Sequence, residues 1–89
     1  MFEKGEKNMN EVAFEILEHI GTLNERENHD ETWTMEINVV SWNGRPPKID
    51  IREWNKSHDR MTKGYTMTEK QAEIMTMCLH NWFRERGNK

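Results

Sequence analysis

The chain has 89 residues and a mass of 10.8 kDa, which allows one domain with a small core. Hydrophobic residues make up 34% and charged residues 33%, yet four Trp and seven Met are too many large apolar side chains for a disordered chain. The single cysteine excludes an internal disulfide and any multi-cysteine metal site, and the net charge of -3, taken alone, argues against a nucleic-acid partner.

The charge is unevenly distributed along the chain. Residues 1–31 carry nine acidic and three basic side chains, which is a net charge of -6. Residues 32–67 carry six basic and four acidic side chains, and residues 68–89 carry four basic and three acidic ones. An acidic first third therefore masks a mildly basic remainder, and a nucleic-acid partner stays possible for that remainder.

The first ten residues are polar and show no hydrophobic period, so we expect residues 1–10 to form a mobile tail ahead of a single domain at 11–87. Phe14, Ile16 and Ile20 then recur on one parity, which favours a strand. A helix is the competing interpretation, because several residues between them are good helix formers. The polar, acidic stretch that follows, from 24 to 31, is expected to be a connection.

Three more strands are predicted after this connection. Residues 32–42 alternate most clearly, and one face carries Trp33, Met35, Ile37 and Val39. An Asn-Gly pair at 43–44 and two prolines at 46–47 predict a turn and loop. Residues 48–54 alternate again and 61–67 form a short last strand, which completes a four-stranded antiparallel sheet.

One long helix is predicted at the C-terminal end. Thr68 and Gln71 fit a capping box, in which each side chain bonds the other residue's backbone amide. Behind them a stripe with the helical period consists of Ile74, Met75, Cys78, Leu79 and Trp82. The predicted fold class is α+β, with this helix covering one face of the sheet, where Trp33 and Trp82 belong to the core.

The other face of the sheet is expected to stay open to solvent. It would carry Lys48, Arg52, Trp54 and Trp42. Bases stack on aromatic rings for about 1–3 kcal/mol each, and cations follow the phosphates, so this composition suits a platform for single strands. A protein-interaction surface is the alternative, because Trp and Arg also dominate protein interfaces. The thin core and the wide apolar stripe of the helix favour a homodimer through the helix.

Three segments resemble a known family: V-S-W-N-G from Val40, P-K-I-D-I-R-E-W ending at Trp54, and K-G-Y-T-M-T-E from Lys63. The sequence is similar, from about Val12 to Leu79, to the positive cofactor four family of transcriptional coactivators, and most closely to its bacterial YdbC-type branch. The resemblance implies a curved four-stranded sheet followed by one helix, a symmetric homodimer, and binding of single-stranded DNA with little sequence preference.

The same resemblance implies which residues bind DNA. Two aromatic residues would stack bases, and four basic residues would neutralise phosphates: Trp42, Trp54, Arg45, Lys48, Arg52 and Lys63. The Ser- and Lys-rich tail of the eukaryotic coactivator is absent, so coactivator activity is not implied.

The sequence predicts no enzyme. The four His residues show no metal-ligand spacing, and there is no phosphate-binding loop or nucleophile motif. We expect no cofactor and no small-molecule substrate. No segment approaches the roughly 18 apolar residues of a membrane helix, so we expect no membrane partner and a cytoplasmic, nucleoid-associated protein. Single-stranded RNA and an adaptor that docks a partner protein on the exposed tryptophans stay open as alternatives.

Overall fold

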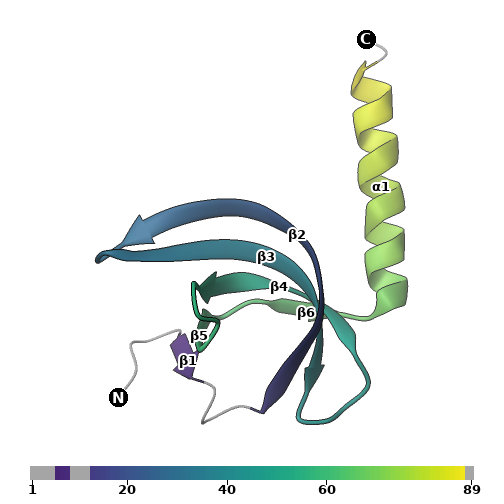
Figure 1. The fold of residues 1–89 in the computed structure, drawn as a ribbon. Coiled ribbons are helices and arrows are strands. Elements are labelled where there is room, and N and C mark those ends of the chain that lie inside the picture. The colour runs from purple at the N-terminus through teal and green to yellow at the C-terminus, as the bar shows by residue number, and fades with distance from the viewer. Residues whose placement is uncertain (1–5, 9–12, 88–89) are drawn as a thin grey trace.

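The protein is an open antiparallel sheet followed by one C-terminal helix, seen in a computed structural model that describes residues 6–8 and 13–87 (Figure 1). The elements are β1 (Glu6–Asn8), β2 (Phe14–Asn28), β3 (Glu31–Trp42), β4 (Lys48–Asn55), β5 (Arg60–Thr62), β6 (Tyr65–Met67) and α1 (Glu69–Gly87). The strand order is β1-β5-β4-β3-β2, and β6 also pairs with β4. The predicted α+β class, an antiparallel sheet followed by one helix, is confirmed, but within the described residues the sheet has six strands where four were predicted.

Two strand boundaries differ from the prediction. The expected connection at 24–31 is wrong, because β2 continues to Asn28 and the chain reverses at His29 and Asp30, whose φ angles are 53° and 65°. Polar residues there indicated a loop, but most of β2 is exposed on both faces, so it needs few apolar residues. The expected last strand is divided into β5 and β6 around Lys63 and Gly64.

The expected mobile tail at 1–10 stays a prediction. Of that segment the structure describes only Glu6–Asn8, which pair antiparallel with β5 as β1. The rest of it, and the first two residues of the expected domain, lie outside the described residues.

Three irregularities in β2 explain why its alternation is blurred. The pairing with β3 skips Leu17, Ile20 and Leu23 in turn, so each is an extra residue at a bulge. Bulges bend a strand and increase its twist. Because the three bulges are three residues apart, the hydrophobic residues of this edge strand follow neither the period of a helix nor the alternation of a regular strand.

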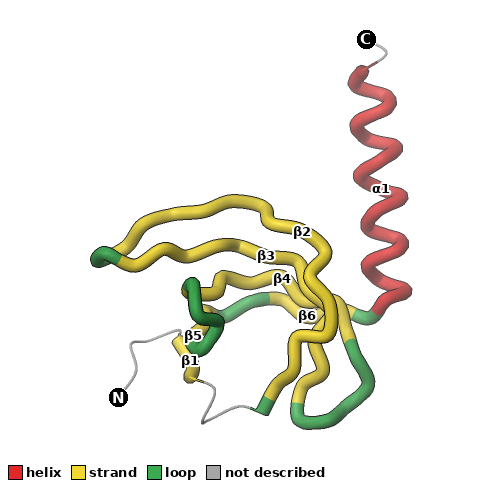
Figure 2. Tube along the Cα trace, in the orientation of Figure 1, coloured by secondary structure: helices red, strands yellow, loops and turns green. Residues whose placement is uncertain are grey.

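The sheet curves so strongly that its inner face closes into the core. Phe14 lies opposite Trp42 at one end of the pairing, whereas Trp54 lies opposite Thr34 near the other end. The Phe14 and Trp54 rings are nevertheless only 5.1 Å apart between centroids, which is possible because both project into the concave side. Trp54, Val40 and Met61 are buried there. Figure 2 shows the β2–β3 turn and the 43–47 loop at opposite ends of this curved sheet.

Helix α1 does not cover the sheet, so that prediction is wrong for the single chain. It begins as predicted, since the Gln71 amide donates to Thr68 Oγ1 at 3.1 Å and the Thr68 amide to Gln71 Oε1 at 2.9 Å. It then points away from the sheet (Figure 1), and none of its residues is buried. Trp82 is 50% exposed. Trp33 is buried as predicted, but the guanidinium groups that lie over its ring belong to Arg26 and Arg60.

A buried carboxylate, Glu36, organises the polar part of the inner face. It accepts hydrogen bonds from Thr34 at 2.5 Å and Asn38 at 3.1 Å, and His58 Nε2 lies 3.0 Å from the same carboxylate. Burial opposes ionisation of Glu36, but the bonds from Thr34, Asn38 and His58 outweigh it and lower the pKa of this carboxyl.

We expect Glu36→Gln to weaken the acid sensitivity of folding. Because the pKa of Glu36 is lower in the folded state, its ionised form stabilises the fold above the unfolded value, near 4.5, and this stabilisation is lost as the pH falls through the folded pKa. The variant should be less stable at pH 7 by roughly 1–3 kcal/mol and lose less stability on acidification. Urea unfolding at a series of pH values measures both effects; parallel curves for the two proteins would contradict the prediction.

Candidate nucleic-acid interface

A partly open hollow of about 240 Å³ lies where the β3–β4 loop meets β6, and it gathers three of the six predicted binding residues. Its lining consists of Trp42, Arg45, Pro46, Lys48 and Thr66. This volume is below the roughly 300–1,000 Å³ of pockets that enclose a small-molecule ligand. The hollow is therefore too small to enclose a typical small-molecule ligand completely.

The loop geometry follows from its sequence. Asn43 and Gly44 take positive φ angles of 54° and 72°, as the Asn-Gly turn requires. The Arg45 amide donates to the Trp42 carbonyl at 2.9 Å, and Ser41 Oγ donates to the Arg45 carbonyl at 2.8 Å. These bonds fix the backbone of Arg45 beside the indole.

The hollow combines an aromatic surface with positive charge. Trp42 is half buried, whereas Arg45 and Lys48 are exposed. Exposed cations can meet phosphate groups with little desolvation, while a half-buried indole keeps a stable orientation and some accessible ring. This end of the sheet can therefore bind an anionic, aromatic ligand.

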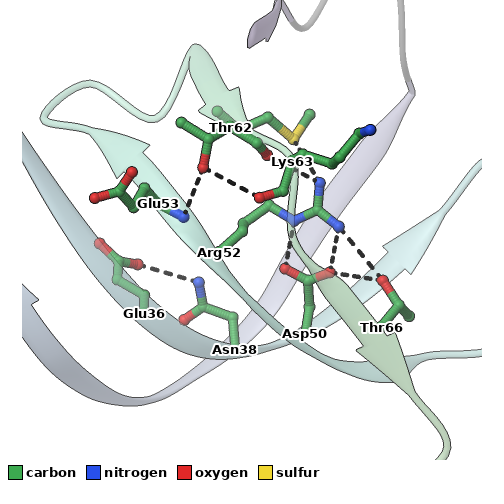
Figure 3. A network of polar contacts seen from close by, with 9 residues as sticks. Glu36, Asn38, Asp50, Arg52, Glu53, Thr62, Lys63 and Thr66 are labelled. Carbon is green, nitrogen blue, oxygen red and sulfur yellow. Dashed lines mark hydrogen bonds and ion pairs between the residues drawn. The ribbon is translucent and has the colours of Figure 1, made fainter. Parts of the chain in front are cut away.

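Arg52 does not line the hollow, contrary to its predicted role as an open phosphate contact. Its Nε and one Nη each donate to Asp50 at 2.7 Å (Figure 3), and the Asp50 side chain is completely buried. The other Nη donates to the Thr62 carbonyl at 3.3 Å, and the side chain of Arg52 is only 13% exposed. Asp50, which lies two residues before Arg52 on the same strand, therefore holds this cation in an ion pair.

Gly64 allows the chain to close over Arg52. A Cβ at Gly64 would lie 2.3 Å from the Cβ of Arg52 and 2.4 Å from the Ile51 carbonyl oxygen. Any other residue would force the link between β5 and β6 away from β4. The K-G step of the sequence is therefore explained by the close approach at its glycine.

Trp54 and Lys63 also differ from their predicted positions in the site. Trp54 is 0% exposed, so the prediction of an open stacking surface is wrong for this residue, because the curvature of the sheet turns it into the core beside Phe14 and His58. Lys63 is exposed, as expected, but lies in the link between β5 and β6 and does not line the hollow.

The predicted site omitted three residues of this region: Pro46, Asp50 and Thr66. Pro46 and Thr66 line the hollow, and Thr66 donates to Asp50 at 2.8 Å. Asp50 could have been found from the sequence, because residues two apart on a strand share a face, and an acid at that spacing from Arg52 can pair with it.

Among the described residues, no three His, Cys, Asp or Glu side chains are grouped to hold a metal ion. No helix in the described part of the chain is long and apolar enough to cross a membrane.

A curved antiparallel sheet with an indole and two exposed cations at one hollow has the aromatic and positively charged groups that small nucleic-acid-binding proteins use. The chain belongs to the family described as Transcriptional Coactivator p15 (PC4), whose model matches residues 29–76. It is also 41% identical over 64 residues to an uncharacterized protein of Treponema pallidum (strain Nichols), and the match covers 72% of this chain and 69% of that protein. The predicted family is thus confirmed. It supports nucleic-acid binding in general and indicates no enzymatic reaction.

Proposed function

We propose that the protein binds single-stranded DNA with little sequence preference, in the cytoplasm at the nucleoid, through the hollow at Trp42. The observation that carries this proposal is the convergence of one indole with Arg45 and Lys48 around a hollow of about 240 Å³. A base would stack on the Trp42 ring while the two cations meet the adjacent phosphates. None of these contacts reads the hydrogen-bonding edge of a base, so binding would tolerate any sequence.

We also propose that the binding form is a homodimer. Six apolar residues of α1 are 38% to 61% exposed: Ile74, Met75, Met77, Leu79, Trp82 and Phe83. The outer face of the sheet is only half buried at Met35, Ile37, Val39, Ile49 and Ile51. Exposed apolar area on this scale usually marks an interface. A second copy would supply the cover that the outer face and the helix lack within one chain.

The proposed site predicts a specific salt dependence. We expect an oligo-dT of about 20 nucleotides to quench tryptophan fluorescence, and log K to fall with log salt by about 0.7 for each phosphate contacted. Lys48→Ala should reduce this slope by about 0.7, because one phosphate contact is lost. Lys56→Ala is the matched control: Lys56 is an exposed lysine in the β4–β5 loop and does not line the hollow, so its slope should stay unchanged.

The same titration distinguishes the other candidate ligands. If the wild-type protein does not bind oligo-dT at low salt, the proposed function is wrong. Tighter binding of a matched RNA would identify RNA as the ligand, and equal binding of duplex DNA would contradict a stacking site, because paired bases are not available to Trp42. The adaptor alternative has less support, since Trp54 is buried and cannot dock a partner.

A further inference from the structure

Arg52 lies over the ring of Trp42 but does not line the hollow. The Arg52 guanidinium carbon lies 4.6 Å from the centroid of the Trp42 ring. Arg52 is not among the residues around the hollow, whereas Trp42 is. The guanidinium therefore lies over the Trp42 ring without forming part of the lining of the hollow.

No hydrogen bond from the indole itself fixes this orientation. The Nε1 of Trp42 is buried and has no hydrogen-bond partner within the described part of the chain. The ring is instead oriented by the stacked Arg52 and by a tilted contact with Phe14, 5.9 Å between centroids. The position of Arg52 is in turn set by its two bonds to Asp50 (Figure 3) and by the close approach of Gly64.

We infer that Asp50 and Arg52 are positioning residues for the nucleic-acid site: Asp50 holds the guanidinium over the Trp42 ring, so that the ring is presented rigidly to a base. This inference rests on the proposed function, and it replaces the direct phosphate contact that the sequence predicted for Arg52. In this role Asp50, whose carboxylate is completely buried, favours the binding of a polyanion although both carry negative charge.

The direction in which Asp50→Asn changes the affinity for DNA distinguishes the two possible roles of Arg52, phosphate contact and positioning residue. If electrostatics alone decided, Asp50→Asn would remove a negative charge, release Arg52 and strengthen binding to DNA. In the positioning role it weakens binding to oligo-dT by about fivefold, the size of one cation–π contact, with the salt slope unchanged because no phosphate contact is lost. Arg52→Lys keeps the charge but lacks a planar group, and it should show the same loss.

Glu53→Gln is the matched control. Glu53 lies on the same strand and also accepts two bonds from an arginine, at 2.6 and 2.9 Å, but that arginine, Arg26, stacks on Trp33 instead. The charge change is the same, so only Asp50→Asn should lower the affinity. In a Trp42→Leu background, Asp50→Asn should have no further effect, because both substitutions act through one ring.

A measurement without DNA keeps this inference separate from the proposed function. In protein labelled with 5-fluorotryptophan, the resonance of Trp42, assigned by its loss in Trp42→Phe, should shift in Asp50→Asn and Arg52→Lys and stay in place in Glu53→Gln. If wild-type protein fails to bind oligo-dT, the proposed function fails while this resonance still tests the support of Trp42. An unshifted resonance, tighter binding by Asp50→Asn, or full affinity in Arg52→Lys would overturn the inference.

Discussion

Trp42→Leu should weaken binding to oligo-dT by roughly 5- to 150-fold, which corresponds to the loss of about 1–3 kcal/mol for one stacked base. Leucine keeps an apolar side chain against Phe14 but offers no aromatic face. The salt slope should not change, because Arg45 and Lys48 still meet their phosphates. Fluorescence titration and a filter-binding series at several salt concentrations measure the two quantities independently.

The quenching signal supplies a further check on the same variant. Trp33 and Trp54 are buried, and Trp82 lies on the helix that points away from the sheet, so Trp42 is the tryptophan placed to report a bound base. Trp42→Leu should therefore abolish most of the DNA-dependent quenching. Trp42→Phe keeps an aromatic ring and should lose less affinity than Trp42→Leu. Equal affinity of wild type and Trp42→Leu would show that DNA, if bound, is bound elsewhere.

The order of elements could be predicted because it depends on local patterns. Strict alternation at 32–42 and the reciprocal bonds of Thr68 and Gln71 are both properties of a few neighbouring residues. The assignment of the sheet faces failed for a different reason. Curvature brings Phe14 to Trp54, which is 40 positions away, and no alternation pattern contains the degree of curvature.

The candidate site was therefore predicted only in part. Arg45 and Lys48 lie beside the hollow because their loop and strand end are local features. Trp54 and Arg52 share the face of Lys48, as the alternation predicted, but that face is the closed one. A polar strand face was interpreted as solvent exposed, whereas Asp50 neutralises its cation inside the core. The spacing of Asp50 and Arg52, two residues apart on one strand, was the sequence feature that could have predicted this buried ion pair.

Leu79→Glu should convert the proposed homodimer into a monomer. Leu79 lies within the apolar stripe of α1 and is 48% exposed in the single chain. A carboxylate there would lose its hydration if a second copy covered the stripe, so association becomes unfavourable. Sedimentation should give about twice 10.8 kDa for wild type and 10.8 kDa for the variant. The melting temperature of wild type should rise with protein concentration, and that of the variant should not.

His80→Glu provides the matched control for the same helix. His80 is exposed and follows Leu79 by one position, which is roughly 100° around the helix, on the side opposite the stripe. It should remain a dimer. A dimer presents two hollows to one strand, so Leu79→Glu should bind an oligo-dT of about 20 nucleotides at least tenfold more weakly, while an oligo-dT of about 6 nucleotides, which occupies one hollow, should bind both proteins alike. Wild-type protein that sediments as a monomer, or a dimer that survives Leu79→Glu, would mean that the exposed stripe of α1 has another occupant.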